Sequence, residues 1–452
     1  MAFERDSLMV LPLNDFSGGI NSSVSPQFLA DNEYQMIKNF EFDMNRLKTR
    51  GGVSAPLATY PDDIVAFYYD DSTKCYLVCL KNKDIYEEDL SNLHNKVGTL
   101  EGDNKPNFCS FDGKIFIASG GHLQYYDYTK HAVIAIEESY LCDFVFERFG
   151  RIVVCHEGDD NLYYSSVGDP YDTGWEDASN DDSTSKYIEI GYKDNGDILK
   201  ALPISGDIAI FKSNGRIYTL SGEYPNWSLM MTGENTDAIN AESIVVLGSS
   251  IAFMSKAGIK TLEGVQTYGN FTVNEVGRKF NKNIVGNIHS PVMFNIVRKR
   301  QLIIVPNTTS EDESKKVFCY QYDVGAGIYF EFAIPIVDMQ DTINGVMIAS
   351  GKSLYRWDKQ YLDDNGTAIE QEIITKELKS TRRLYTRRLE ASFEGTKDDV
   401  VEFWWSNKKV PFKVGGLRNV IEFFNVCSRS QMVIKTNKNI TLEYANLYLT
   451  EK

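Results

Sequence analysis

The sequence predicts an all-β protein: a β-propeller of about six or seven blades, with an N-terminal arm and a C-terminal β-sandwich domain. Three observations lead to this prediction. Aromatic residues, mostly Tyr and Phe, make up 12% of the 452 residues, and these residue types favour strands. Pairs of short alternating apolar runs joined by turn residues recur along the chain, which is typical of β-hairpins. They recur about every 40 to 55 residues without a helical pattern between them, as in propeller blades.

The clearest copies of the repeat are IASGGHLQYYD at residues 117–127 and IASGKSLYRWD at residues 348–358. Both share Ile-Ala-Ser-Gly, a Leu at the seventh place and a final Asp. An alternating apolar run lies on each side of the turn, so each copy predicts a hairpin. Looser copies of the repeat occur elsewhere in the chain. Together with the two clear copies they predict seven hairpins, whose first strands are expected to centre on Tyr76, Ile115, Ile152, Ile208, Ile251, Ile303 and Val346. These centres place the propeller at residues 55–366.

The Gly-Lys-Ser at residues 351–353 raises the possibility of a phosphate-binding loop. Such a loop needs four residues between its two glycines and a helix after the Lys. Here five residues separate Gly345 from Gly351, an apolar run follows, and the other copy of the repeat has no Lys. We therefore interpret the stretch as a hairpin turn and do not expect an NTPase.

The two ends of the chain differ from the repeats. After Gly366, several alternating runs separated by short turns predict a β-sandwich at residues 367–452. Arg382, Arg383, Arg387 and Arg388 form a predicted basic patch that could contact DNA or the acidic rim of a partner; the alternative is a strand with exposed arginines. Residues 1–54 are polar and rich in turn residues, which predicts a docking arm. Within it, residues 30–40 are expected to form a short helix with Asp31 as N-cap.

The charge balance limits the role that DNA can have. Lys and Arg total 47 against 63 for Asp and Glu, so the net charge is 47 − 63 = −16. A chain of this charge is not expected to hold phosphate backbones tightly, although DNA could pass it. No signal peptide or membrane anchor is expected, because no apolar run reaches membrane-spanning length. The seven scattered cysteines predict reduced thiols.

No residue pattern in the chain compels catalysis. Residues 168–175, GDPYDTGW, partly match a sialidase Asp-box through Asp172 and Gly174, but Pro170 and the position of Trp175 do not fit. A carbohydrate-binding or glycan-cleaving propeller is therefore the alternative function, with Trp175, Trp227 and Trp357 stacking on sugars. Residues 362–366, LDDNG, predict a turn rather than a calcium loop. We predict no enzyme, no catalytic residue, no metal site and no cofactor.

The N-terminal segment carries the most specific pattern. It combines Gly-Gly-Ile, a Pro, a Leu, a later Asn and a final Leu-x-x-Arg-Gly, and it resembles the start of the tail nozzle proteins of short-tailed bacteriophages, also called tubular or hub proteins. The pattern falls on Gly18, Gly19, Ile20, Pro26, Leu29, Asn39, Leu47, Arg50 and Gly51. Residues 162–175, LYYSSVGDPYDTGW, resemble a second feature of such proteins.

The resemblance implies a virion structural protein. It implies a homohexameric ring that closes and gates the DNA-exit channel at genome ejection, located in the viral tail and assembled in the host cytoplasm. The implied partners are the tail adaptor ring, tail fibres or spikes, and viral double-stranded DNA that passes through without tight binding. The nine residues of the N-terminal pattern are then expected to dock on a partner. A tail fibre or receptor-binding protein is a third possibility, which the lack of short fibrous repeats disfavours.

Overall fold

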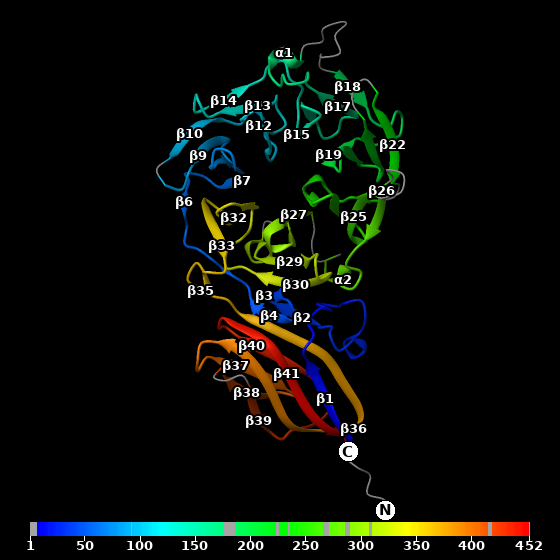
Figure 1. The fold of residues 1–452 in the computed structure, drawn as a ribbon, viewed down its shortest axis with the longest axis vertical. Helices are drawn as coiled ribbons and strands as arrows, with labels where there is room; N and C mark the ends of the chain where they lie inside the picture. Colours follow the sequence, from blue (N-terminus) through cyan, green and yellow to red (C-terminus); the bar gives the residue numbers. More distant parts are fainter. Residues whose placement is uncertain are drawn as a thin grey trace, which may run out of the picture.

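The computed structural model describes residues 7–91, 93–175, 186–222, 226–233, 236–264, 271–284, 290–306, 310–414 and 418–451. These residues form an all-β fold in which four-stranded units surround a common centre (Figure 1). Such an arrangement is a β-propeller. Neighbouring units touch through their first strands, in the first two units through the stacked rings of Tyr68 and Phe108, and the first strand of the last unit also contacts that of the first unit, so the ring is closed.

Five of the sheets contain four strands each, paired in sequence order. Their strands are β7 (Ile64–Asp70), β8 (Cys75–Leu80), β9 (Asp84–Glu88) and β10 (His94–Thr99); β11 (Asn107–Phe111), β12 (Lys114–Ala118), β13 (Gln124–Asp127) and β14 (Ala132–Ala135); β15 (Phe144–Arg148), β16 (Arg151–Cys155), β17 (Asn161–Tyr164) and β18 (Lys186–Glu189); β19 (Ile198–Ile204), β20 (Asp207–Lys212), β21 (Ile217–Ser221) and β22 (Ser228–Gly233); β23 (Ile244–Leu247), β24 (Ser250–Ser255), β25 (Gly258–Gly264) and β26 (Phe271–Glu275).

Two further units belong to larger sheets. One consists of β27 (Pro291–Ile296), β28 (Gln301–Pro306), β29 (Lys316–Gln321) and β30 (Ala326–Glu331); the other begins with β31 (Asp338–Thr342), β32 (Gly345–Ser350) and β33 (Ser353–Asp358). The seven strand centres expected from the repeat all lie in the second strand of a unit, from Tyr76 in β8 to Val346 in β32. Every residue of β32 is buried, because this strand is sandwiched between neighbouring sheets.

The structure confirms that residues 351–353 form a hairpin turn. Strands β32 and β33 pair antiparallel, with Ser350 opposite Ser353, and Gly351 has a φ of +51° between them. Glycine adopts this left-handed conformation without the steric penalty that other residues meet. The Lys352 ammonium donates to the Pro61 carbonyl at 2.8 Å, so in this structure it contacts the chain itself.

The N-terminal segment completes the last unit of the ring. Strands β5 (Gly52–Val53) and β6 (Ala58–Thr59) both pair with β33, where Trp357 lies opposite Val53 and Leu354 opposite Ala58. Two short strands, β34 (Asp363–Asp364) and β35 (Thr367–Ala368), extend this sheet beyond β5. The last unit of the ring is therefore completed by a segment about 300 residues away in sequence.

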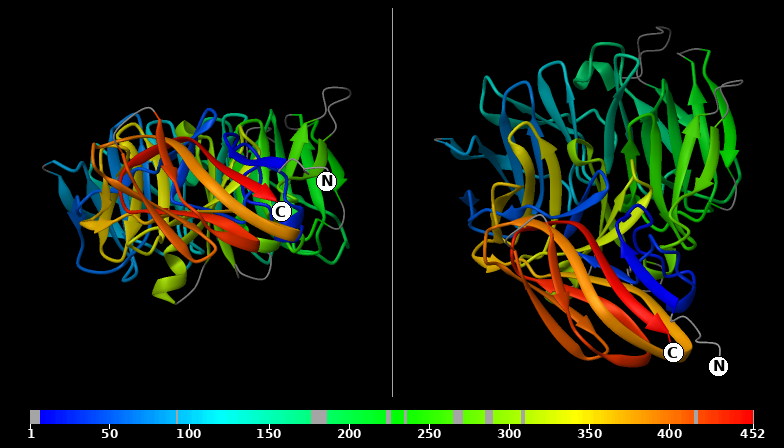
Figure 2. Two further views of the ribbon diagram at one scale, coloured as in Figure 1. Left: turned by 90° about the horizontal axis from the view of Figure 1, so that it is seen from below. Right: turned by 60° about the horizontal axis from the view of Figure 1, so that its bottom comes forward.

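A continuous sheet joins the ring to the C-terminal strands. Strand β2 (Met36–Lys38) pairs parallel with β30 and antiparallel with the 25-residue strand β36 (Gln371–Gly395). Beyond β36 the sheet continues through β40 (Val426–Thr436), β37 (Val400–Trp405) and β38 (Lys408–Lys413). Figure 2 shows these strands at one side of the ring.

The second half of β36 takes different neighbours. It pairs with β39 (Asn419–Glu422) and β41 (Ile440–Glu451), and β41 in turn pairs with β1 (Ser7–Leu13). Strands β3 (Phe40–Asp43) and β4 (Arg46–Thr49) form a hairpin that also reaches β41. Apolar side chains of both groups, including Phe403, Ile434, Leu389 and Leu447, form one buried cluster.

Helices are few and short among the described residues. They are α1 (Asp172–Trp175), α2 (Asn281–Ile284), α3 (Glu311–Ser314) and the 3-10 turns η1 (Pro26–Phe28), η2 (Ala241–Ser243) and η3 (Val297–Lys299). No described helix has the length and apolar character needed to span a membrane. The expected helix over residues 30–40 with Asp31 as N-cap is wrong. Part of this stretch is strand β2, because Ile37 is fully buried between β30 and β36 and that pairing overrides the local preference.

Candidate functional site

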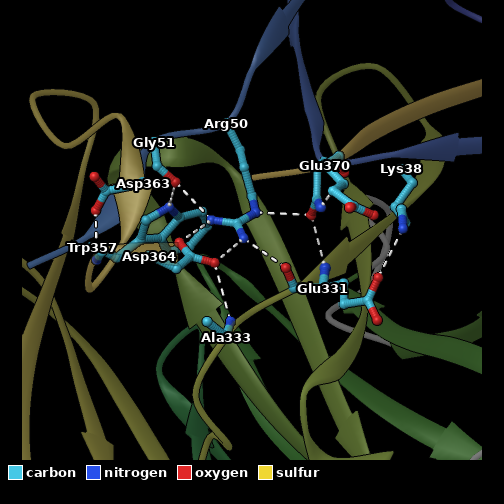
Figure 3. Close-up of polar contacts among 11 residues, drawn as sticks. Lys38, Arg50, Gly51, Glu331, Ala333, Trp357, Asp363, Asp364 and Glu370 are labelled. Carbon is cyan, nitrogen blue, oxygen red and sulfur yellow. Dashed lines mark hydrogen bonds and ion pairs between the residues drawn. The ribbon is translucent and has the colours of Figure 1, made fainter. Parts of the chain in front are cut away.

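Arg50 lies at the centre of a polar network that joins the ring to the C-terminal strands (Figure 3). Its side chain has no exposed surface, and its two Nη atoms bind the Asp364 carboxylate at 2.6 and 3.0 Å. Its Nε donates to the Asn39 Oδ1 at 2.9 Å, and its Nη atoms also donate to the carbonyls of Gly51 and Glu331 at 2.8 and 2.7 Å. All five guanidinium hydrogens therefore have an acceptor.

The same network fixes four segments of the chain. The Asn39 Oδ1 also accepts from the Glu331 backbone N–H, and the Asn39 amide donates to the Glu370 carbonyl just before β36. The Asp364 Oδ2 accepts from the Ala333 backbone N–H, and the Trp357 indole donates to the Gly51 carbonyl. Arg50 thus connects the N-terminal segment, β30, the last propeller sheet and the entry to β36.

Two glycines of the N-terminal pattern lie where no side chain fits. A Cβ at Gly18 would come within 2.3 Å of the Asn32 carbonyl oxygen, and one at Gly51 within 2.6 Å of the Asp358 carbonyl oxygen. Both positions therefore require glycine because another part of the backbone passes too close.

Eight of the nine residues in the N-terminal pattern are buried in the chain itself, and Pro26 alone is exposed. Their contacts in this structure are intramolecular: the Ile20 N–H, for example, donates to the Gly327 carbonyl in β30. The docking role expected of this pattern stays a prediction. The segment that was expected to end at residue 54 does not lie apart from the rest of the chain. Strand β1 belongs to the C-terminal sheet, and β5 and β6 belong to the last propeller sheet.

The ring encloses an axial cavity of about 220 Å³. Side chains from all seven first strands line it, among them Phe67, Phe108, Phe144, Lys200, Val245, Phe294 and Met339. It adjoins a second cavity of about 360 Å³, which shares Lys105, Glu242 and Val292 with it.

Four charged side chains meet in the axial cavity. The Lys105 Nζ lies 3.1 Å from the Glu242 carboxylate and 3.8 Å from that of Asp338. Lys200 donates instead to the carbonyls of Ala241 and Ile244, both at 3.0 Å. Burial lowers the pKa of Lys200, while burial raises the pKa of Asp338 despite the nearby Lys105. Two cations and two anions thus balance within the cavity.

Side chains of the first strands also bind the backbone of the next unit. The Asp338 Oδ2 accepts from the Phe67 N–H at 2.9 Å, and the Gln340 Oε1 accepts from the Tyr69 N–H at 2.8 Å. The Asn107 Oδ1 accepts from the Val145 N–H at 3.1 Å. Asp338 therefore serves both the charge cluster and the contact between the last and first units.

Replacing Lys105 by Met is expected to destabilise the fold in a pH-dependent way. Burial already raises the pKa of Asp338, whereas that of Glu242 lies below its ordinary value because Lys105 and Lys200 outweigh its burial. Without the Lys105 ammonium, we expect burial to raise the folded-state pKa values of both carboxyls above their unfolded values. The folded state then binds protons more tightly, so the free energy of unfolding of the variant rises as the pH falls. We expect a loss of about 1–3 kcal/mol at pH 7 that shrinks towards pH 4, measured against wild type by urea unfolding at both pH values.

The matched control is Lys83→Met, which removes an exposed pair with Asp103, a carboxylate 87% exposed. It should cost less than about 0.5 kcal/mol at either pH. A loss for Lys105→Met that is equal at both pH values would contradict the role assigned to the two carboxylates.

The four arginines predicted as a basic patch lie on β36. Residues 380–383 leave the ladder with β40, whose register jumps from Lys379–Arg429 to Leu384–Cys427, and Arg382 and Arg383 are exposed on this bulge. A second register shift, between Thr386 and Arg388, lets Arg387 and Arg388 point to the same side. The Arg387 Nε donates to the Thr450 Oγ1 at 3.3 Å, and Arg388 lies over the Tyr448 ring at 4.1 Å. The structure thus brings the arginines together at one end of β36.

The residues of the partial Asp-box form a loop and helix α1. Trp175 and Trp357 are almost fully buried, and Trp227 packs edge-on against Tyr164. The buried indoles of Trp175 and Trp357 cannot stack on a sugar, so two of the three tryptophans proposed for carbohydrate binding are not arranged for it; Trp227 is half-buried. The Asp364 of LDDNG instead binds Arg50.

The described residues contain no cluster of His, Cys, Asp or Glu suited to a metal ion. All seven cysteines are free thiols, and burial raises the pKa of Cys155 to about 12. The functional groups that sequence reasoning missed are Asp364 as the partner of Arg50 and the charged cluster around Lys105. Neither has a local signal, because their partners are distant in sequence.

No protein-family model matches the chain, and no curated protein matches it. Among solved structures, it is similar to the extracellular domain of a one component system from B. thetaiotaomicron, with a TM-score of 0.49, 8% identity and 90% of this chain covered; the chain spans 63% of that structure's length. It is also similar to the Cps50 (Swd1) β-propeller domain of Myceliophteria thermophila, with a TM-score of 0.47, 6% identity and coverage of 67% of this chain and 99% of that one. BamB from Moraxella catarrhalis has a TM-score of 0.42, 9% identity and coverage of 71% and 96%. None of these names concerns a phage tail.

Proposed function

We propose that this protein is a virion structural protein, a tail nozzle subunit of a short-tailed phage. The observation that carries the proposal is the N-terminal pattern from Gly18 to Gly51, whose residues form the junction between ring and C-terminal strands. In a structural subunit, a polar network such as that of Arg50 holds domains together rather than facing an open cleft. The Arg50 donors are all used inside the chain, which agrees with such a role.

We further propose seven blades and a C-terminal β-sandwich. Seven first strands line the axial cavity, which supports one blade for each. The sandwich is supported by the apolar cluster between the strands around β37 and those around β41. The proposed division is residues 55–366 for the propeller and 367–452 for the sandwich, with residues 1–54 shared between them.

In the proposed assembly, six copies form a hexameric ring around the channel through which viral DNA leaves. This hexamer gates the channel. The surplus of acidic residues would repel phosphates and let DNA slide without tight binding. The adaptor ring and the tail fibres or spikes are the proposed neighbours. No catalytic step is part of this function.

The test is imaging of the native particle, with classification by rotational symmetry. A sixfold ring with an axial channel at the end of a short tail is the expected result. A threefold spike would overturn the proposal in favour of a receptor-binding protein, and absence of the chain from any particle would overturn it altogether.

A further inference from the structure

The end of the C-terminal domain presents an exposed face that mixes apolar and basic side chains. Leu8 lies opposite Thr450 in the ladder of β1 with β41, and Tyr385 lies opposite Thr450 in the ladder of β41 with β36. Residues in register across a sheet point to the same side. Leu8, Thr450 and Tyr385 therefore share one face.

The same register extends this face towards the arginines. Val10 lies opposite Tyr448, and Tyr448 lies opposite Arg388. Because of the register shift after Thr386, Arg387 joins Arg388 on this side, as its hydrogen bond to Thr450 shows. We call this surface the tip face: Leu8, Val10, Tyr385, Arg387, Arg388 and Phe424, with Arg382 and Arg383 on the adjoining bulge.

The tip face is exposed and held in place. Leu8, Val10 and Phe424 are 63%, 45% and 61% exposed, and the Tyr385 and Phe424 rings are 6.0 Å apart. The chain after Phe424 is fixed because Thr386 and Asn425 exchange backbone and side-chain hydrogen bonds. Arg387, Arg388 and Phe424 also line a surface pocket of about 440 Å³, together with the exposed Glu422, which lies opposite Arg388. A fixed surface loses little conformational entropy when a partner binds.

The composition of the tip face fits a protein partner. Exposed Phe and Arg are enriched in protein–protein interfaces, whereas Leu8, Val10 and Phe424 would have no counterpart on a phosphate backbone. The partner must be acidic to complement the arginines. The chain itself, with a net charge of −16, offers such a surface.

An acidic face lies at the other end of the molecule. Asp112, Glu137, Glu138 and Asp172 are all exposed, and the Glu138 N–H donates to the carboxylate of Asp172, the first residue of α1. Figure 1 places α1 and the C-terminus at opposite ends of the longest axis. The tip face is next to that C-terminus, since Leu384 pairs with Glu451. One chain thus carries complementary charges at its two ends.

We propose that the tip face of one copy binds the acidic face around α1 of a second copy. Such an interface is heterologous, so its repetition gives a ring if the rotation closes. This inference rests on the proposed function, because the interface would join neighbouring copies in the proposed hexameric ring. The net negative charge of each copy opposes association. At the contact itself, the arginines of the tip face attract the acidic face of the second copy.

The test measures self-association of the full chain by sedimentation velocity at about 50 and about 500 mM salt, because screening weakens contacts between exposed charges. We expect salt-sensitive association of the wild-type chain. Arg382→Glu/Arg383→Glu should weaken it about tenfold or more, and so should Glu137→Lys/Glu138→Lys on the opposite face. Mixing these two variants should restore association, because each then offers the charge that the other lacks.

The matched control is Lys256→Glu/Lys316→Glu, which changes the net charge by the same amount at exposed sites in the ring. It should leave self-association within about twofold of wild type. A wild-type chain that stays monomeric at low salt, or a mixture that fails to associate, would overturn the proposal. Binding of a short DNA duplex that depends on Arg382 and Arg383, without self-association, would assign the tip to DNA instead. Particle imaging tests the nozzle separately, so this contact can hold even if that function fails.

Discussion

Replacing Arg50 by Leu is expected to lower the free energy of unfolding by about 3–5 kcal/mol, because it leaves a buried carboxylate without its cation. The Asp364 side chain is 3% exposed, so water cannot replace the lost partner. The acceptors on Asn39, Gly51 and Glu331 lose the Arg50 donor as well, while the Asn39 Oδ1 keeps the Glu331 N–H and the Gly51 carbonyl keeps the Trp357 indole. Urea unfolding followed by circular dichroism measures the loss.

Two variants show whether the network or the charge alone is responsible. Arg50→Lys keeps the cation but cannot reach all five acceptors, so we expect an intermediate loss. Arg46→Leu removes an arginine that is 36% exposed and pairs with Asp43 and Glu394, and it should cost less than about 1 kcal/mol. Equal losses for Arg50→Leu and Arg46→Leu would contradict the structural role of Arg50.

Deletion of residues 1–59 is expected to abolish cooperative unfolding of the whole chain. It removes β5 and β6 from the last propeller sheet, β2 from between β30 and β36, and β1 from the edge of β41. The exposed strand edges should also cause aggregation. Thermal melting followed by circular dichroism and light scattering tests this expectation.

Deletion of residues 1–6 is the control, since they precede β1, and it should leave the melting transition unchanged. Co-expression of residues 7–59 as a separate chain should restore the transition in part, because the missing strands can then bind in their own places. If the chain without residues 1–59 melts like the full-length protein, the segment does not close the ring. A deletion this large cannot be used to test docking on a partner, whereas substitution of the exposed Phe28 can.

The repeating hairpins could be predicted because their signal is local. Alternation of apolar residues with a period of two, followed by a turn, is visible within a dozen residues. The strand centres expected at Ile115 and Val346 were therefore predicted correctly, and they lie in β12 and β32. The arginine cluster on β36 could also be predicted from the sequence, because its four members are close to one another along the chain.

The closure of the ring and the Arg50 network could not be predicted in the same way. Strand β5 has two residues, and its partner β33 lies about 300 residues later, so neither a periodicity nor a turn marks the pairing. Asp364 follows Arg50 by 314 residues and looks like an ordinary turn residue in DDNG. The helix expected near Asp31 failed for a related reason: the pairing of β2 with two distant strands decides its conformation.

The sheet from β27 through β2 and β36 to β38 connects the propeller to the C-terminal strands by backbone pairing, with β2 joined to β30 at Lys38 and Tyr329. A displacement of the C-terminal strands therefore acts on the wall of the propeller through the backbone pairing of β2 with β36 and β30. In the proposed nozzle, we therefore expect the channel to open by tilting of whole subunits against one another. A hinge within a single copy would have to break this ladder first.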